Sequence, residues 1–152
     1  MQPQIKTLTP KKLIGFNTTM SLAQNTTGVL WQRFMQRRKE VQNTVGTDLY
    51  SLQIYDEKLD FKDFNLSTQF VKWAATEVSD FSVIPAEMET LELPEGLYAV
   101  FLYKGRPSDF GPTFNYIFNE WLPASEYCLD NRAHFEILGE KYKNNDPESE
   151  EE

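Results

Sequence analysis

Apolar side chains recur at helical spacing in two stretches of the chain. In the first, they repeat every three to four positions from Leu30 to Val41, with polar residues between them. This pattern predicts an amphipathic helix over about residues 26–42. In the second, a Phe and Trp stripe runs over residues 110–121, with Pro112 in the expected first turn and Pro123 at the expected end. Both prolines stand where a helix tolerates or requires them.

Shorter apolar segments predict strands around these helices. The clearest cover residues 49–55, 69–78, 87–93 and 134–138. The longest uninterrupted apolar run covers residues 97–103. Because both of its faces avoid charge, we expect this run to form one central strand.

The two halves of the chain repeat the same order of elements. At an offset of 83 residues, apolar positions fall on each other: Trp31 on Phe114, Phe34 on Ile117, and 52–55 on 135–138. Each half reads strand, helix, strand, strand, so we predict an α+β fold built from a duplicated β-α-β-β unit, with pseudo-repeats over about 3–80 and 86–145. Such a duplication gives a mainly antiparallel sheet with two helices on one face and a central groove, a natural ligand site.

Length and charge set the domain organisation that we expect. The chain has 152 residues, of which 40% are hydrophobic, and its net charge is −8. One domain over residues 1–145 suits this length. Residues 146–152 are mostly acidic, so we predict a solvated tail without a fold of its own. The rest of the chain is not basic, and we therefore expect no direct nucleic-acid contact.

Several chemistries find no support in the sequence. The chain has one cysteine, Cys128, and one histidine, His134, so we expect no metal site and no cofactor. No signal peptide and no apolar run long enough to span a bilayer is present, and we predict a cytoplasmic protein without a membrane partner. No familiar catalytic motif appears. Cys128 and His134 are a conceivable nucleophile pair, but a packed or loop cysteine is favoured.

Glu136 is the most informative polar residue, because it interrupts the apolar strand at 134–138. Side chains alternate along a strand, so Phe135 and Glu136 point to opposite faces. If the Phe135 face packs under the helices, Glu136 lies in water. If Glu136 faces the groove, burial among aromatic rings raises its pKa. Periodicity alone favours the solvated alternative, and it likewise favours a structural role for each single aromatic residue.

Four segments carry a resemblance to a known family. Residues 85–105, PAEMETLELPEGLYAVFLYKG, resemble the strand–turn–strand of GyrI-like small-molecule-binding domains, the effector-binding domains of AraC- and MerR-type multidrug regulators within the SOUL-like superfamily. Residues 120–127 resemble the end of that family's second helix, 131–138 its glutamate-bearing strand and 70–78 its third strand. The resemblance covers about residues 3–147.

The resemblance implies a duplicated β-α-β-β fold whose groove binds amphipathic, often aromatic and cationic compounds. Glu136 matches the family's pocket glutamate, which reverses the preference for a solvated carboxylate, and Trp73 and Trp121 match aromatic positions. We therefore expect a stand-alone module that binds hydrophobic, cationic small molecules, as in multidrug recognition and transcription regulation. Its expected ligand-binding residues are Glu136, Trp73, Phe101, Tyr103, Tyr55 and Trp121.

Two alternatives stay open at this point. Some family members hydrolyse cyclopropane-type electrophilic toxins, and here Glu136 would act as the general acid or base. Leu138 stands where the family commonly has Tyr, so Tyr103 or Tyr127 would have to supply the hydroxyl. Other members act on a protein partner, as gyrase inhibitors do. The family's final strand follows its acidic turn, and we expect this strand to be missing here.

Overall fold

The structure is a computed structural model that describes residues 1–152, and it has an α+β fold. Its strands are β1 (Gln4–Leu8), β2 (Lys11–Met20), β3 (Thr44–Ile54), β4 (Phe70–Val78), β5 (Glu89–Leu93), β6 (Gly96–Val100), β7 (Tyr103–Lys104), β8 (His134–Leu138) and β9 (Glu150–Glu151). Its helical segments are α1 (Thr27–Arg37), η1 (Arg38–Glu40), η2 (Phe61–Asp63), η3 (Pro107–Asp109), α2 (Gly111–Tyr116), η4 (Ile117–Trp121) and α3 (Leu122–Ala124). No helix is long and apolar enough to cross a membrane.

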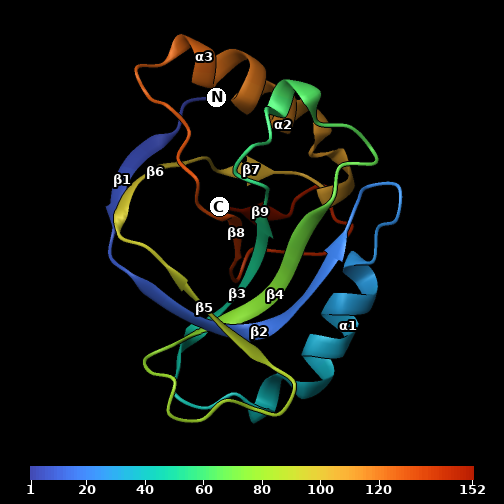
Figure 1. The fold of residues 1–152 in the computed structure, drawn as a ribbon, viewed down its shortest axis with the longest axis vertical. Helices are drawn as coiled ribbons and strands as arrows, with labels where there is room; N and C mark the ends of the chain where they lie inside the picture. The colour runs from blue at the N-terminus through green and yellow to red at the C-terminus, as the bar shows by residue number, and fades with distance from the viewer.

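An antiparallel sheet of five strands, in the order β5-β2-β4-β3-β8, forms the centre of the molecule. Two further ribbons join β1 to β6 and β7 to β9. Backbone hydrogen bonds in both directions between Ile137 and Glu152 place the end of β9 beside β8. Figure 1 shows α1 along one side of the sheet and α2 and α3 at the opposite end of the molecule.

The pairing of β3 with β8 supports the predicted duplication. Leu52 and Phe135, which the 83-residue offset aligns, are direct partners in this ladder. A local pseudo-twofold axis therefore passes through the pair, and each repeat contributes one of its two strands. The predicted α+β fold with two helices and a mainly antiparallel sheet is confirmed.

The sheet has two faces with different partners. On the helix face, where α1 packs, Leu30 and Phe34 of α1 contact a buried cluster that includes Phe16 and Ala74. Gly15 is required here, because a Cβ atom at this position would lie 2.0 Å from the carbonyl oxygen of Ala74. The opposite face carries a second cluster with Leu13, Tyr50, Leu52, Trp73, Ala75 and Leu93.

The apolar run at 97–103 is not one central strand, and that prediction is wrong. It divides into β6 and β7, and β6 pairs only with β1. Leu97 is 52% exposed, while Tyr98 packs on Phe135. One side of β6 thus faces solvent, and charge avoidance alone did not distinguish this edge ribbon from a strand buried on both faces.

The acidic end of the chain is folded, contrary to the prediction of a solvated tail. Ser149 is 1% exposed; its carbonyl oxygen accepts a hydrogen bond from the Gly105 N–H, and its hydroxyl accepts one from the Lys143 N–H. Glu150 and Glu151 form β9 against β7. The final strand that we expected to be missing is therefore present in short form, because the backbone edges of β7 and β8 offer it hydrogen-bond partners.

The second predicted helix is less regular than its pattern suggests. Pro112 lies in the first turn of α2, as predicted. The helix then widens into the π-helical turn η4 and continues as α3, which includes Pro123. A π-helical turn is uncommon and is frequent at functional sites.

Candidate functional site

The structure separates the six predicted ligand-binding residues. Glu136 lies on the helix face, and Tyr55, two positions after Gln53, is directed to the same face. Phe101 packs edge-on against Trp121, with 5.2 Å between the ring centroids. Tyr103 packs edge-on against Phe110, with 5.1 Å between the ring centroids. Trp73 is 6% exposed and belongs to the cluster on the opposite face.

The register of the sheet fixes the direction of Glu136. Its partner in β3 is Ser51, and the partner of Ser51 in β4 is Ala74, a member of the cluster under α1. Directly paired residues share a face, so Glu136 lies on the helix face and Phe135 on the opposite face. Of the two alternatives, the sheet therefore excludes the one in which Phe135 packs under the helices.

The Glu136 carboxylate is held by its counterpart in the other repeat. Gln53, 83 residues earlier, donates hydrogen bonds of 3.2 and 3.3 Å from Nε2 to the two carboxylate oxygens. Burial raises the pKa of Glu136, while the charge of Lys72 and the Gln53 bond oppose this rise. The residue still keeps part of its surface accessible. A desolvated carboxylate with accessible surface is what a narrow binding crevice requires.

Lys72 is the nearest buried cation. It pairs with Gln53 across β3 and β4, so it lies on the helix face, and it is 7% exposed. Burial lowers the pKa of its ammonium group, and the carboxylates of Glu136 and Glu151 counteract that effect. Lys72 and Glu136 are within electrostatic reach, yet they form no direct ion pair.

Glu151 adds a second carboxylate. Glu151 is partly buried. Burial and the negative charge of Glu136 raise the pKa of Glu151 to about 7, and the positive charge of Lys72 opposes this rise to a smaller extent. Four polar side chains from four adjacent strands thus cross the helix face diagonally. We call them the charged diagonal: Lys72 on β4, Gln53 on β3, Glu136 on β8 and Glu151 on β9.

An aromatic cluster covers one end of the charged diagonal. Its members are Tyr55, Phe61, Phe64, Phe70, Phe114, Phe118 and His134. Phe61 stacks on Phe118 with 4.7 Å between the ring centroids, and on His134 with 5.4 Å between them. Burial lowers the pKa of His134 to about 4, so its ring is neutral at pH 7. Stacked neutral rings of this kind provide faces that attract a cation.

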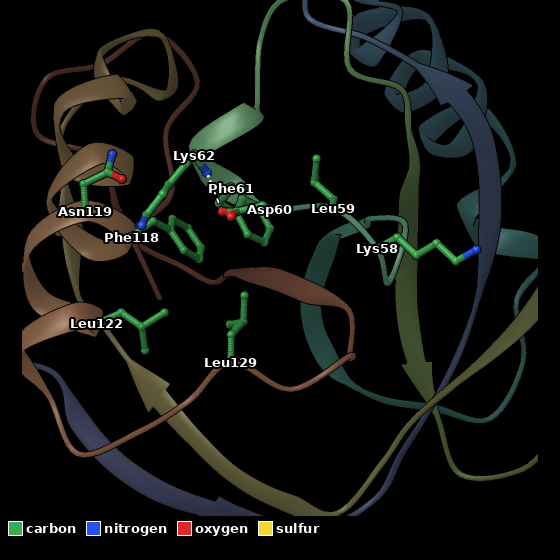
Figure 2. A pocket seen from close by; sticks show the side chains of 9 residues that line it. All are labelled: Lys58, Leu59, Asp60, Phe61, Lys62, Phe118, Asn119, Leu122 and Leu129. Carbon is green, nitrogen blue, oxygen red and sulfur yellow. Dashed lines mark hydrogen bonds between the residues drawn. The ribbon is translucent and has the colours of Figure 1, made fainter.

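Two open hollows flank the aromatic cluster. The first, of about 370 Å³, lies between the loop around η2 and the π-helical turn. Figure 2 shows Phe61 and Phe118 side by side in it, with Leu122 and Leu129 beyond them and Lys62 reaching across from η2. The second, of about 300 Å³, is lined in part by Tyr55 and Phe70. Glu136 lines neither hollow.

Several site residues were not found from the sequence. Phe61 and Phe64 stand in a polar stretch, and their isolated aromatic character was the only available signal. Lys72 interrupts the apolar strand β4 as Glu136 interrupts β8, so the same argument applied to it. Glu151 was assigned to the tail. Its role depends on the pairing of β9, which local sequence does not specify.

The two tyrosines named as substitutes for a hydroxyl at Leu138 make other contacts. Tyr103 donates its hydroxyl to the Arg106 carbonyl at 2.6 Å, and Tyr127 stacks on Trp121. Tyr55, which the 83-residue offset aligns with Leu138, stands two positions after Gln53, the residue that donates to Glu136. No group of three His, Cys, Asp or Glu side chains is arranged to hold a metal ion. Cys128 is exposed.

Comparison with solved structures shows the same fold in proteins of low identity. SAV2435, solved bound to tetraphenylphosphonium, is 19% identical with a TM-score of 0.69, covering 99% of this chain and 91% of that chain. An integron cassette protein from the mobile metagenome of Vibrio cholerae is 18% identical with a TM-score of 0.66, over 99% and 92%. EcmrR, solved in a complex with DNA, is 14% identical with a TM-score of 0.72, and the match covers 99% of this chain and 55% of EcmrR.

The family assignment comes from the sequence as a whole. No curated protein matches this chain. Residues 1–152, including the folded acidic end, match the family described as GyrI-like small molecule binding domain. The chain belongs to the GyrI-like family of small-molecule-binding domains.

Proposed function

We propose that this domain binds a lipophilic aromatic cation between the aromatic cluster and Glu136. The observation that carries the proposal is the desolvated Glu136 carboxylate beside the stacked rings of Phe118 and His134. A carboxylate in such surroundings gains more from a bound cation than one in water, because the protein interior screens charge less.

The aromatic rings supply the remaining selectivity. Each cation over a ring face contributes about 0.5–2 kcal/mol, depending on its desolvation. Flat apolar groups of a ligand can replace the contacts that Phe61 now makes, since the aromatic cluster is formed by rings rather than by polar side chains. SAV2435, which shares this fold, was solved with tetraphenylphosphonium, a cation of this chemistry.

Calorimetric titration with two ions of the same shape tests the proposal. Tetraphenylphosphonium and tetraphenylborate have four phenyl groups and opposite charge. We expect the cation to bind and the anion to bind at least about tenfold more weakly, which corresponds to about 1.4 kcal/mol. Binding should also raise the melting temperature of the protein, and the increase should grow with the logarithm of the ligand concentration above Kd.

A conservative variant identifies the charge that is responsible. Glu136→Gln keeps the shape of the side chain and an acceptor for Gln53, and it should weaken cation binding about tenfold or more. Glu140→Gln, an exposed carboxylate four residues away, is the matched control and should bind normally. Equal affinity of the Glu136→Gln variant and the unchanged protein for the cation would contradict the proposed counter-charge.

Hydrolysis of an electrophilic compound is a second candidate, favoured by the position of Tyr55. Its hydroxyl has a raised pKa and stays protonated beside Glu136, which is the pair that acid–base chemistry on a strained ring requires. Incubation with a cyclopropane-bearing alkylator followed by product analysis separates the two functions. A pure binding domain returns the compound intact, whereas a hydrolase releases a ring-opened product that the Tyr55→Phe variant does not form.

A further inference from the structure

We propose that the Glu136–Glu151 pair takes up one organic monocation in exchange for one proton, and that Lys72 sets this one-to-one exchange. The inference rests on the proposed function and adds Glu151 and Lys72 to the residues that determine specificity. It follows from the geometry of the charged diagonal and from the charge that its members carry.

The pairing of β9 with β8 brings the two carboxylates together. Ile137 and Glu152 exchange backbone hydrogen bonds of 2.6 and 3.3 Å, so they are directly opposite each other. Side chains alternate along each strand, which puts Glu151 opposite Leu138 and on the face that carries Glu136. Glu136 and Glu151 are therefore diagonal neighbours on adjacent strands, within about 7–8 Å.

Lys72 determines how much negative charge the pair can hold. With both carboxylates ionised, the cluster has a net charge of −1, because Lys72 neutralises one of them. Burying that unbalanced charge is costly, and a proton on one carboxyl removes the cost. A bound monocation removes it equally well, so proton and ligand compete for the same negative charge.

Burial favours the protonated form of both carboxyls of the pair. Burial and Glu136 raise the pKa of Glu151 to about 7. The other ionisable groups around this cluster are Lys72 on β4, Tyr55 after β3, His134 on β8, Tyr103 on β7 and Tyr142 in the loop between β8 and β9. Burial keeps the three tyrosines protonated and His134 neutral at pH 7, so Lys72 is the only cation among them. Lys104 and Lys141 are paired with Glu148 and Glu150 at the surface.

The exchange balances simply. In the unliganded protein below pH 7, the Glu136–Glu151 pair holds one carboxylic proton and Lys72 is ionised. When the cation enters, that proton passes from a carboxyl oxygen of the pair to solvent, and the two carboxylates face one ligand cation and one ammonium group. No covalent bond to the ligand forms.

Calorimetry in two buffers of different ionisation enthalpy, phosphate and Bis-Tris, measures the proton directly. Tetraphenylphosphonium binding at pH 6 should release about one proton, and Kd should be about tenfold higher at pH 6 than at pH 8, because each pH unit below the pKa of a released proton costs about a factor of ten. Binding with equal affinity at both pH values and no released proton overturns this inference and leaves the proposed function intact. Absence of binding at both pH values overturns both.

Three variants assign the effect to residues. Glu151→Gln should bind the cation with nearly no proton release and little pH dependence, while Glu152→Gln, one residue on and directed to the other face, should behave as the unchanged protein. Lys72→Met should bind the cation more tightly at pH 8, and the pH at which its affinity changes should shift upward. Lys39→Gln, at an exposed lysine, serves as its control. Proton release that persists in Glu151→Gln, or an unmoved midpoint in Lys72→Met, contradicts the role given to that residue.

Discussion

The two repeats use the same helix position in different ways. In the first repeat, α1 places Leu30 and Phe34 in the core at 4% and 0% exposure. In the second repeat, no residue of α2, η4 or α3 is buried. Of the 24 buried residues of the chain, only Tyr103 and Ser149 lie beyond Leu93.

This difference indicates that most of the packed core belongs to the first repeat, which supplies most of the buried side chains of the sheet. The second repeat contributes the π-helical turn, and its Phe114 and Phe118 contact Phe61 and Phe64 of the first repeat in the aromatic cluster. The candidate site therefore lies where the two repeats meet, and only the first of them is packed as a domain core.

The largest expected effect comes from comparing two residues that the repeat aligns. Phe34→Ala removes a fully buried ring and should lower the free energy of unfolding by about 3–5 kcal/mol. Ile117→Ala, at the aligned position, should cost less than about 2 kcal/mol, because its side chain is already partly accessible. Urea unfolding of both variants measures the difference. Similar losses would show that the second repeat is as tightly packed as the first.

The same comparison explains which features of the fold and of the site could be predicted from the sequence. The offset that aligns Leu52 with Phe135 was visible in the sequence, because apolar periodicity is local and repeats faithfully. Phe61 was not assigned, because it reaches the site by contacts with Phe118 and His134 from distant elements. Trp73 lies on the face opposite Glu136. Its neighbour Lys72 faces the site instead, since a shift of one residue reverses the face and only the register decides it.

The next largest expected effect is the pH dependence of stability that His134 causes. Its pKa is lowered from 6.5 to about 4 in the folded protein, so between these values the unfolded chain binds more protons. Stability is therefore present above pH 6.5 and is lost as the pH falls toward 4, by up to about 3 kcal/mol at about 1.4 kcal/mol for each unit of pKa. The His134→Phe variant has no titrating ring at this position. Its free energy of unfolding in urea should therefore increase relative to that of the unchanged protein as the pH falls. A constant difference between the two proteins from pH 7 to pH 4 would contradict the burial of this ring.

Glu151 should show the opposite dependence. Its pKa is raised from 4.5 to about 7 in the folded protein, so the stability it contributes is present below pH 4.5 and is lost as the pH rises through 7. Glu151→Gln should then unfold with a free energy about 1–2 kcal/mol higher than the unchanged protein at pH 8, and the two should agree at pH 4.5. This range is discounted because the carboxyl keeps some contact with water. Unfolding measured at both pH values checks the sign, and a Glu151→Gln variant less stable at pH 8 would contradict it.

The smallest expected effect concerns Phe61, which occupies space beside His134 that a ligand ring could take. Phe61 is presented by the loop around η2, whereas Phe118 and His134 belong to a helical segment and a strand, so Phe61 is the ring with the least rigid support. Phe61→Ala should raise the affinity for tetraphenylphosphonium by about threefold to tenfold, or about 0.7–1.4 kcal/mol, because the ligand no longer has to displace this ring. Phe81→Ala, which removes a ring packed against the core of the first repeat, should lower stability and leave affinity unchanged. If Phe61→Ala instead weakens binding, Phe61 is a wall of the site that contacts the ligand, and the space for the ligand lies beside this ring rather than in its place.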